Sequence, residues 1–153
     1  MLRFLLAPDS LKGALSAIEA CDAMQRGIAR AASSADVSTQ YEIISVPLAD
    51  GGEGTIDAFR LGAGGELRIA KVRGPLEYEV DAQWLILPDG RAVIEMAQAS
   101  GLTLVEPAKR RALDASTFGT GELIKAALDA GCREILIGIG GSATTDGGAG
   151  ALR

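Results

Sequence analysis

Two glycine-rich segments of this chain combine acidic side chains with backbone that can approach a ligand closely. Residues 49–55 read ADGGEGT and include Asp50 and Glu53, and residues 138–150 read GIGGSATTDGGAG and include Asp146. Glycine permits positive φ and leaves backbone amides accessible, and groups of such amides bind phosphate and carboxylate. The pattern therefore indicates chemistry on an anionic substrate, with carboxylates available as general bases or metal ligands.

A third loop, 9–13, follows the apolar segment 2–7 and reads DSLKG. Lys12 is a candidate point charge for a transferred phosphate, Ser10 a hydroxyl donor, and Asp9 a base or metal ligand. Taken alone, Lys12 is equally well interpreted as a solvated surface lysine. The candidates for phosphate or substrate binding are Asp9, Ser10, Gly51, Gly52, Glu53, Gly54, Gly140, Gly141, Ser142, Gly147 and Gly148.

The charged candidates differ in the roles that their surroundings suggest. Asp50 is the first candidate for a catalytic base or metal ligand, Asp146 is the second, and Lys12 is the candidate catalytic cation. An acid such as Glu53, close to a predicted helix start, can also simply stabilise the helix dipole. Glu95 stands in an apolar strand pattern, where it is either a functional buried carboxylate or part of a solvated face.

Composition excludes several classes of function. The chain of 153 residues has no His, so a Ser-His-Asp triad, an imidazole base and a His-based zinc site are excluded. A net charge of -5 and 4% aromatic residues argue against nucleic acid as a partner. The apolar N-terminal stretch is too short for a membrane span or signal segment, which predicts a cytoplasmic protein. Homo-oligomerisation is left open.

The pattern of apolar residues predicts an α/β layer with flanking helices. Strands are expected at 2–7, 42–47 and 134–139, and a capping box of Ser16 and Glu19 opens a helix that runs to about residue 32. Each of the three loops follows or adjoins one of these strands. In one parallel sheet, the carboxyl ends of the strands would bring the three loops to the same edge.

The middle of the chain has a different pattern. Residues 78–86 alternate between apolar and polar types, a turn at 88–90 follows, and a strand is expected at 92–96. We interpret 63–113 as a strand-rich antiparallel subdomain, and 1–62 with 114–153 as pieces of an α/β domain that is incomplete at its C-terminal end.

Six blocks along the chain occur in a fixed order: 7–13, 49–55, 74–75, 93–97 with 99–102, 116–124 and 137–150. In these blocks the sequence resembles the first part of the class I glycerate kinases. The resemblance implies part of a two-domain α/β kinase fold, with phosphorylation of D-glycerate by ATP, normally to 2-phosphoglycerate, and with Mg²⁺. It also implies a complete enzyme more than twice as long.

Two alternatives to a kinase remain at this point. Gly138, Gly140 and Ala143 match the relaxed GxGxxG/A fingerprint of dinucleotide-binding oxidoreductases, although this is a weak pattern in a glycine-rich run. A truncated or binding-only chain without catalysis is the second alternative, because a parallel sheet cut after a strand leaves an apolar face uncovered. The P-loop pattern of Walker-type NTPases is absent from the sequence.

Overall fold

The computed structural model describes residues 1–34 and 40–153. The chain forms two compact units, Met1–Ala49 and Asp50–Arg153. The first unit contains β1 (Leu2–Leu6), α1 (Ala17–Ser34) and β2 (Tyr41–Ser45). The second contains α2 (Thr55–Ala63), β3 (Glu66–Arg73), β4 (Glu79–Ile86), β5 (Ala92–Glu95), α3 (Ala97–Ser100), α4 (Phe118–Asp129) and β6 (Ile135–Gly138), with short 3₁₀ helices at Leu102–Leu104, Pro107–Lys109 and Gly150–Leu152.

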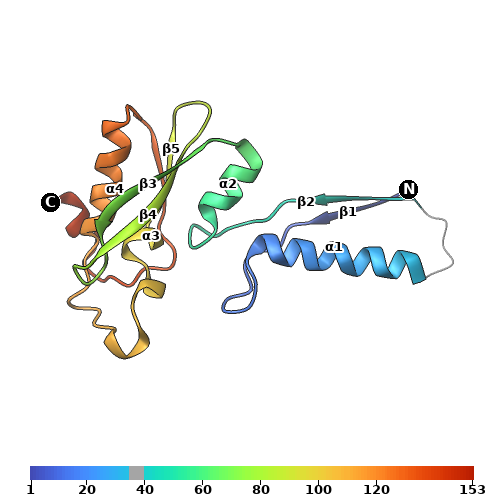
Figure 1. Cartoon of the computed structure of the whole chain (residues 1–153), viewed down its shortest axis with the longest axis horizontal. Helices are drawn as coiled ribbons and strands as arrows, with labels where there is room; N and C mark the ends of the chain where they lie inside the picture. The colour runs from blue at the N-terminus through green and yellow to red at the C-terminus, as the bar shows by residue number, and fades with distance from the viewer. Residues whose placement is uncertain (35–39) are drawn as a thin grey trace. The chain divides into compact units, whose positions relative to one another are not determined.

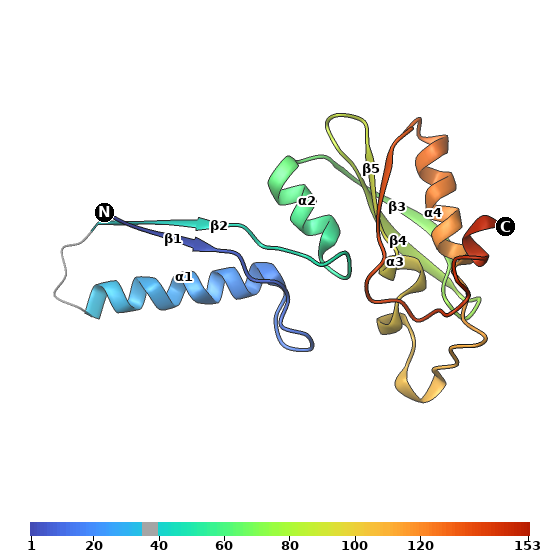
Figure 2. The same cartoon turned by 180° about the vertical axis from the view of Figure 1, so that it is seen from behind.

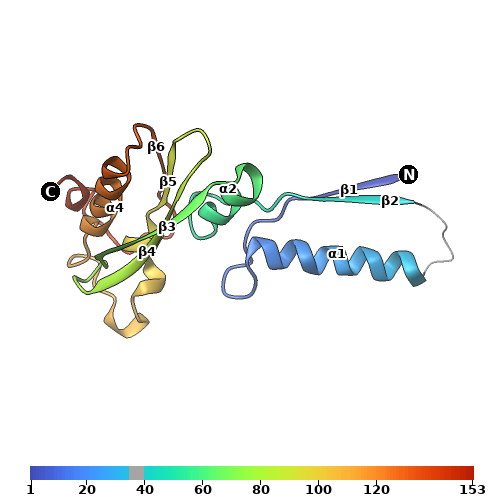
Figure 3. The same ribbon diagram turned by 45° about the horizontal axis from the view of Figure 1, so that its top comes forward.

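In the first unit, α1 connects two parallel strands. β1 and β2 pair in register from Leu2 opposite Tyr41 onward, and Figure 3 shows α1 running alongside them. The helix begins with the predicted capping box: the Ser16 amide donates to Glu19 Oε2 at 2.8 Å, and the Glu19 amide donates to Ser16 Oγ at 3.2 Å. Ala20 and Cys21 on α1 are buried, as is Leu6 on β1.

The second unit is a mixed four-stranded sheet with helices on both faces. Its strand order is β3-β4-β5-β6, with antiparallel pairs except for the parallel pair β5–β6. Figures 1 and 2 show α2 on one side of the β3–β5 strands and α4 on the other. Both sides of the central strands are therefore covered, which matches the complete burial of β5.

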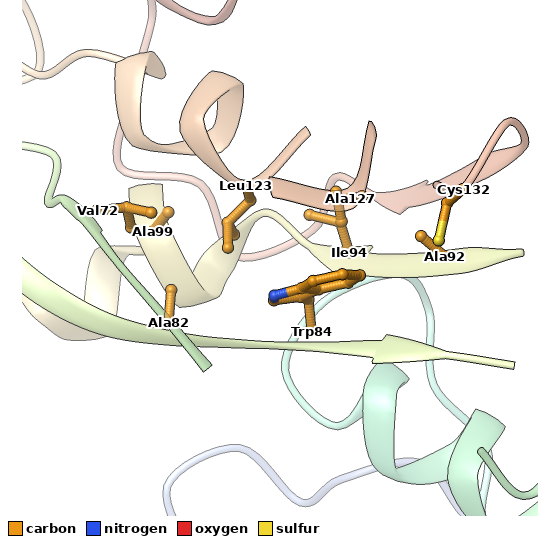
Figure 4. Packing of buried hydrophobic residues seen from close by; sticks show 9 residues of the cluster. All are labelled: Val72, Ala82, Trp84, Ala92, Ile94, Ala99, Leu123, Ala127 and Cys132. Carbon is orange, nitrogen blue, oxygen red and sulfur yellow. The ribbon is translucent and has the colours of Figure 1, made fainter. Parts of the chain in front are cut away.

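Alternation along the strands produces two hydrophobic clusters. Trp84 and Ile94, in register on β4 and β5, contribute to the larger cluster with Leu123 and Ala127 of α4. Figure 4 shows the side chains of this cluster gathered between the strands and α4. The smaller cluster, beneath α2, consists of Ile56, Leu85, Leu87 and Val93. Each fully buried aliphatic or aromatic side chain contributes about 1.5–3 kcal/mol to folding.

The α/β fold class with flanking helices is confirmed, and the antiparallel strands occur where alternation predicted them. The expectation of a single parallel sheet is wrong, because β1 and β2 form one sheet, whereas β6 pairs with β5 in another. The sequence pattern did not distinguish β3 as a strand of its own. The domain limits at 62–63 and 113–114 stay a prediction.

Within residues 1–34 and 40–153, no helix is both long and apolar enough to cross a lipid bilayer.

Candidate functional site

The two glycine-rich segments of the second unit pack directly against each other through backbone. The Gly140 amide donates to the Gly51 carbonyl at 2.9 Å. A Cβ at Gly138 would lie 2.5 Å from Gly51 O, and one at Gly140 would lie 2.6 Å from Gly52 N. Only glycine allows this approach, so these four residues hold the loop after β2 and the loop after β6 together.

We call the two packed loops, 50–54 and 138–141, the paired-loop region. Asp50 lies at its start, with its carboxylate exposed. Its Oδ1 accepts a hydrogen bond from the Gly52 amide at 3.0 Å, which fixes the side chain over the turn. Its Oδ2 accepts no hydrogen bond from the part of the chain that the structure describes. The side chain is therefore oriented and still has an oxygen available for a proton or a cation.

The loop continues directly into α2. Thr55 donates to the Gly52 carbonyl from its hydroxyl at 2.7 Å, and from its amide at 3.2 Å. Gly54 is the N-cap with φ 93°, a conformation that glycine adopts without strain, and it supplies no side-chain cap. Glu53 is exposed, and its Oε1 lies 3.9 Å from the position that a Cβ on Gly141 would take.

Glu95 lies at the carboxyl end of β5 and is a buried carboxylate, so the alternative of a solvated face is wrong. Its side chain is 1% exposed. Oε2 accepts from the Ile56 amide at 3.2 Å, and Oε1 accepts from Gln98 Nε2 at 3.4 Å. Burial raises the pKa of Glu95 above its usual 4.5, although hydrogen bonds from the Ile56 amide, from Gln98 and from the Gly54 amide act in the opposite direction.

Asp146 organises the end of the second glycine-rich segment. Its Oδ2 accepts from the Thr117 amide at 2.8 Å, the Thr117 hydroxyl at 2.9 Å and the Gly150 amide at 3.1 Å. Its Oδ1 accepts from the Gly148 amide at 3.1 Å. Burial alone would raise the pKa of Asp146, but these hydrogen bonds to the ionised form outweigh it and hold the pKa below the usual 3.8.

Replacing Asp146 with Asn should cost about 2–3 kcal/mol of unfolding free energy near neutral pH, because Asn places an NH₂ group against N–H donors. A carboxylate with a depressed native pKa stabilises the fold above its unfolded pKa, and this contribution disappears as pH falls through the lower native value. We therefore expect the difference between wild type and D146N to be constant from about pH 5 to 7 and to shrink below about pH 3.8.

Urea unfolding of both proteins across this pH range measures the difference. Glu79→Gln, at an exposed position on β4, is the control for loss of one carboxylate. A gap that stays the same down to pH 3 would contradict a role for the ionised form.

Thr117 was not among the residues that the sequence singled out. It is the buried N-cap residue of α4, and its hydroxyl also accepts from the Ala151 amide at 3.0 Å. A threonine before an apolar helical pattern was the available signal, but its partner lies far along the chain.

Ser142 makes local contacts, with its Oγ accepting from the Thr144 amide at 3.0 Å. Gly147 and Gly148 follow Asp146, with φ of 62° and 81°.

The first predicted loop belongs to the other unit. The Ser10 amide donates to Asp9 Oδ1 at 2.6 Å, and Lys12 is exposed. The structure therefore brings together the 50–54 and 138–141 loops. The placement of Asp9, Ser10 and Lys12 beside those loops stays a prediction.

Among the described residues, no three Cys, Asp or Glu side chains form a group arranged to hold a metal ion. Mg²⁺ in phosphate-transfer sites is often bound by one or two carboxylates, with substrate phosphates and water as its other ligands. The free oxygen of Asp50 fits that arrangement, whereas Asp146 already accepts four hydrogen bonds.

Comparison with known proteins relates this geometry to one family. The chain is 49% identical over 153 residues to glycerate 2-kinase of Escherichia coli K12, and 48% identical to glycerate kinase of Bacillus subtilis 168. It also matches the crystal structure of a protein assigned as glycerate kinase 2 from Salmonella typhimurium LT2, with a TM-score of 0.74 and 46% identity.

The match covers 99% of this chain in all three comparisons, but only 39%, 38% and 39% of the respective relatives. The chain thus spans about two fifths of the length of these relatives. The model of the glycerate kinase family matches residues 4–153. The chain therefore belongs to the glycerate kinase family.

Proposed function

We propose that this chain forms part of the active site of a kinase that transfers the γ-phosphoryl group of ATP to D-glycerate, giving 2-phosphoglycerate. The observation that supports the proposal most strongly is the paired-loop region, which presents an oriented, exposed carboxylate next to closely packed glycine backbone. Family membership supports a kinase reaction. The choice of ATP, of the 2-hydroxyl and of Mg²⁺ belongs to the proposal.

Asp50 is the proposed base. The hydroxyl oxygen of glycerate forms the new bond to the γ-phosphorus, the bond from that phosphorus to the bridging oxygen of ADP breaks, and the hydroxyl proton goes to Asp50. Backbone of Gly51, Gly52 and Gly140 holds the loop in place while this occurs. Bound Mg²⁺ would neutralise phosphate charge. The alternative role for Asp50 is to hold this ion, for which it is the best-placed residue, and in that case it would not act as the base.

The remaining candidates are proposed to bind the substrates. Ser142 and the glycine pairs 140–141 and 147–148 would line the anion-binding loop, with Glu53 and Gly54 at the start of α2. Asp146 would serve chiefly by holding this loop in shape, because all its hydrogen bonds go to its own fold. Positioning and charge neutralisation supply most of the catalysis in phosphoryl transfer, so the absence of His is no obstacle.

Ser10, Asp9 and Lys12 are proposed to contact phosphate or the glycerate carboxylate. Lys12 is exposed, so removing its side chain should leave the fold intact. We expect Lys12→Ala in the full-length protein to lower kcat/KM by about 100-fold or more, because a point charge on the transferring group is lost. Steady-state kinetics with Lys71→Ala, another exposed lysine, as the control measures this effect. A rate for K12A equal to that of the control would remove Lys12 from the site.

The packing of the glycines argues against the oxidoreductase alternative. Gly138 and Gly140, which matched the dinucleotide fingerprint, are required by their contact with Gly51 and Gly52. Their presence is thus explained without a bound dinucleotide. A cytoplasmic location stays a prediction, and homo-oligomerisation stays open.

The test uses the full-length protein, meaning this sequence with the additional segment that its relatives have. ADP release is measured with ATP, Mg²⁺ and D-glycerate, and ³¹P NMR of the product distinguishes 2-phosphoglycerate from 3-phosphoglycerate. We expect glycerate-dependent formation of the 2-phosphate. Absence of phosphoryl transfer to glycerate would refute the proposal, and formation of the 3-phosphate would correct its regiochemistry.

A further inference from the structure

Glu95 occupies an unusual position for a carboxylate, because it ends a completely buried strand. β5 lies between β4 and β6, and Glu95 is in register with Gly138, where β6 gives way to the second glycine-rich loop. The Met96 amide, next along the chain, donates to the Gly138 carbonyl at 2.9 Å. The Glu95 side chain thus starts from backbone that is fixed to one of the two paired loops.

No cationic side chain among the described residues forms an ion pair with Glu95. Its oxygens instead accept from the Ile56 amide and from Gln98. The first amides of a helix have no partner within the helix, and α2 has no capping side chain of its own. Glu95 supplies the missing acceptor from another strand, with its negative charge at the positive end of the helix.

A continuous series of contacts connects Glu95 with Asp50. Ile56, held by Glu95, follows Thr55, whose hydroxyl donates to the Gly52 carbonyl. The Gly52 amide in turn donates to Asp50 Oδ1. Each contact is a hydrogen bond of 2.7–3.2 Å or a peptide link. A shift in the first turn of α2 would therefore move the carboxylate of Asp50.

We infer that Glu95 is a positioning residue, which holds the first turn of α2 so that the turn at Gly52 orients Asp50. The inference rests on the role proposed for Asp50. Glu95 itself is enclosed, with 1% of its surface exposed, so we assign it no contact with the substrates. Its effect is on the placement of the reacting carboxylate, so its removal lowers kcat far more than it changes KM.

A buried carboxylate is an energetically unfavourable side chain with which to hold the first turn of α2. Burying an ionised group without a cation is unfavourable, and a Gln side chain of the same length could also accept from the amide. Hydrogen bonds to a charged acceptor are about twice as strong as neutral ones, which holds the helix end more rigidly. Glu95→Gln therefore keeps a hydrogen-bond acceptor and removes the negative charge, whereas Glu95→Ala removes both.

The experiment compares Glu95→Gln, Glu95→Ala and the control Glu79→Gln, an exposed carboxylate on β4, in the full-length protein. Kinetics give kcat and the KM for D-glycerate, and hydrogen exchange with mass spectrometry follows segments 50–60 and 66–86. Misplacement of a reacting group by about 1 Å can cost 100-fold in rate, so we expect a loss of about 100-fold in kcat for E95A and about tenfold for E95Q.

We expect KM to change less than about threefold, exchange in 50–60 to become about tenfold faster in E95A, and exchange in 66–86 to stay unchanged. Wild-type kcat in E95A would overturn the inference. So would reduced kcat with unchanged exchange in 50–60, which would indicate a direct role, or faster exchange in both segments, which would indicate general destabilisation.

The two proposals fail in different ways. Lack of glycerate phosphorylation in the unmodified protein contradicts the proposed function, and it does not alter the exchange comparison. Unchanged exchange at 50–60 in E95A contradicts the inference about Glu95, whatever the activity.

Discussion

Replacing Asp50 with Asn in the full-length protein should lower glycerate-dependent kcat by about 1,000-fold, with ATP affinity changed less than about threefold. Asn keeps the shape of Asp and an oxygen that can accept from the Gly52 amide, so the loop should keep its conformation. It cannot take the proton of the substrate hydroxyl and brings no negative charge. An assay of ADP release gives kcat, and calorimetry gives the ATP affinity.

Asp57→Asn is the matched control, because Asp57 is an exposed carboxylate in the first turn of α2, close in sequence to Asp50. It should keep nearly wild-type turnover. If D50N keeps more than about a tenth of the wild-type kcat, Asp50 is neither the base nor a required metal ligand.

Replacing Gly140 with Ala should destabilise the protein by about 3 kcal/mol and abolish most turnover. The added Cβ would lie 2.6 Å from Gly52 N and 2.7 Å from Gly52 Cα, so it meets backbone that cannot rotate away. The two loops must separate to admit it, and the carboxylate of Asp50 would move with its loop. Urea unfolding gives the free energy, and the ADP-release assay gives kcat.

Gly62→Ala is the control, for which we expect the unfolding free energy to change in the opposite direction. Gly62 lies in α2, where an added Cβ would meet no heavy atom within 4 Å, and its φ is ordinary. Ala there should stabilise the protein by about 0.5–1 kcal/mol, because it restricts the unfolded chain. An unfolding free energy of G140A within about 0.5 kcal/mol of wild type would show that the loops do not need this contact.

Local sequence signals predicted local structure well. The capping box of Ser16 and Glu19 involves residues three apart, so its hydrogen bonds follow from the helix itself. The alternation at 78–86 likewise identified β4, because one side chain in two packs inward. In the candidate site, the turn at Asp50 is of this kind, because its glycines mark the loop in the sequence itself.

Features that depend on distant partners could not be predicted in the same way. The burial of Glu95 depends on β5 lying between two other strands, with helices on both faces of the sheet, which a strand pattern alone does not specify. The hydrogen bonds of Asp146 depend on Thr117, which the fold brings to it. The glycines at 138 and 140 suggested a ligand, whereas their contact with the other loop emerges only in three dimensions.

The contact between the paired loops also sets an order of events during protein synthesis. Gly51 is added to the growing chain well before Gly140, and at about 5–20 residues per second the interval is several seconds. Throughout that time, the loop of Asp50 lacks the backbone against which it will pack. The carboxylate can reach its working orientation only after β6 has emerged from the ribosome and joined β5, so Asp50 is synthesised well before it can be oriented.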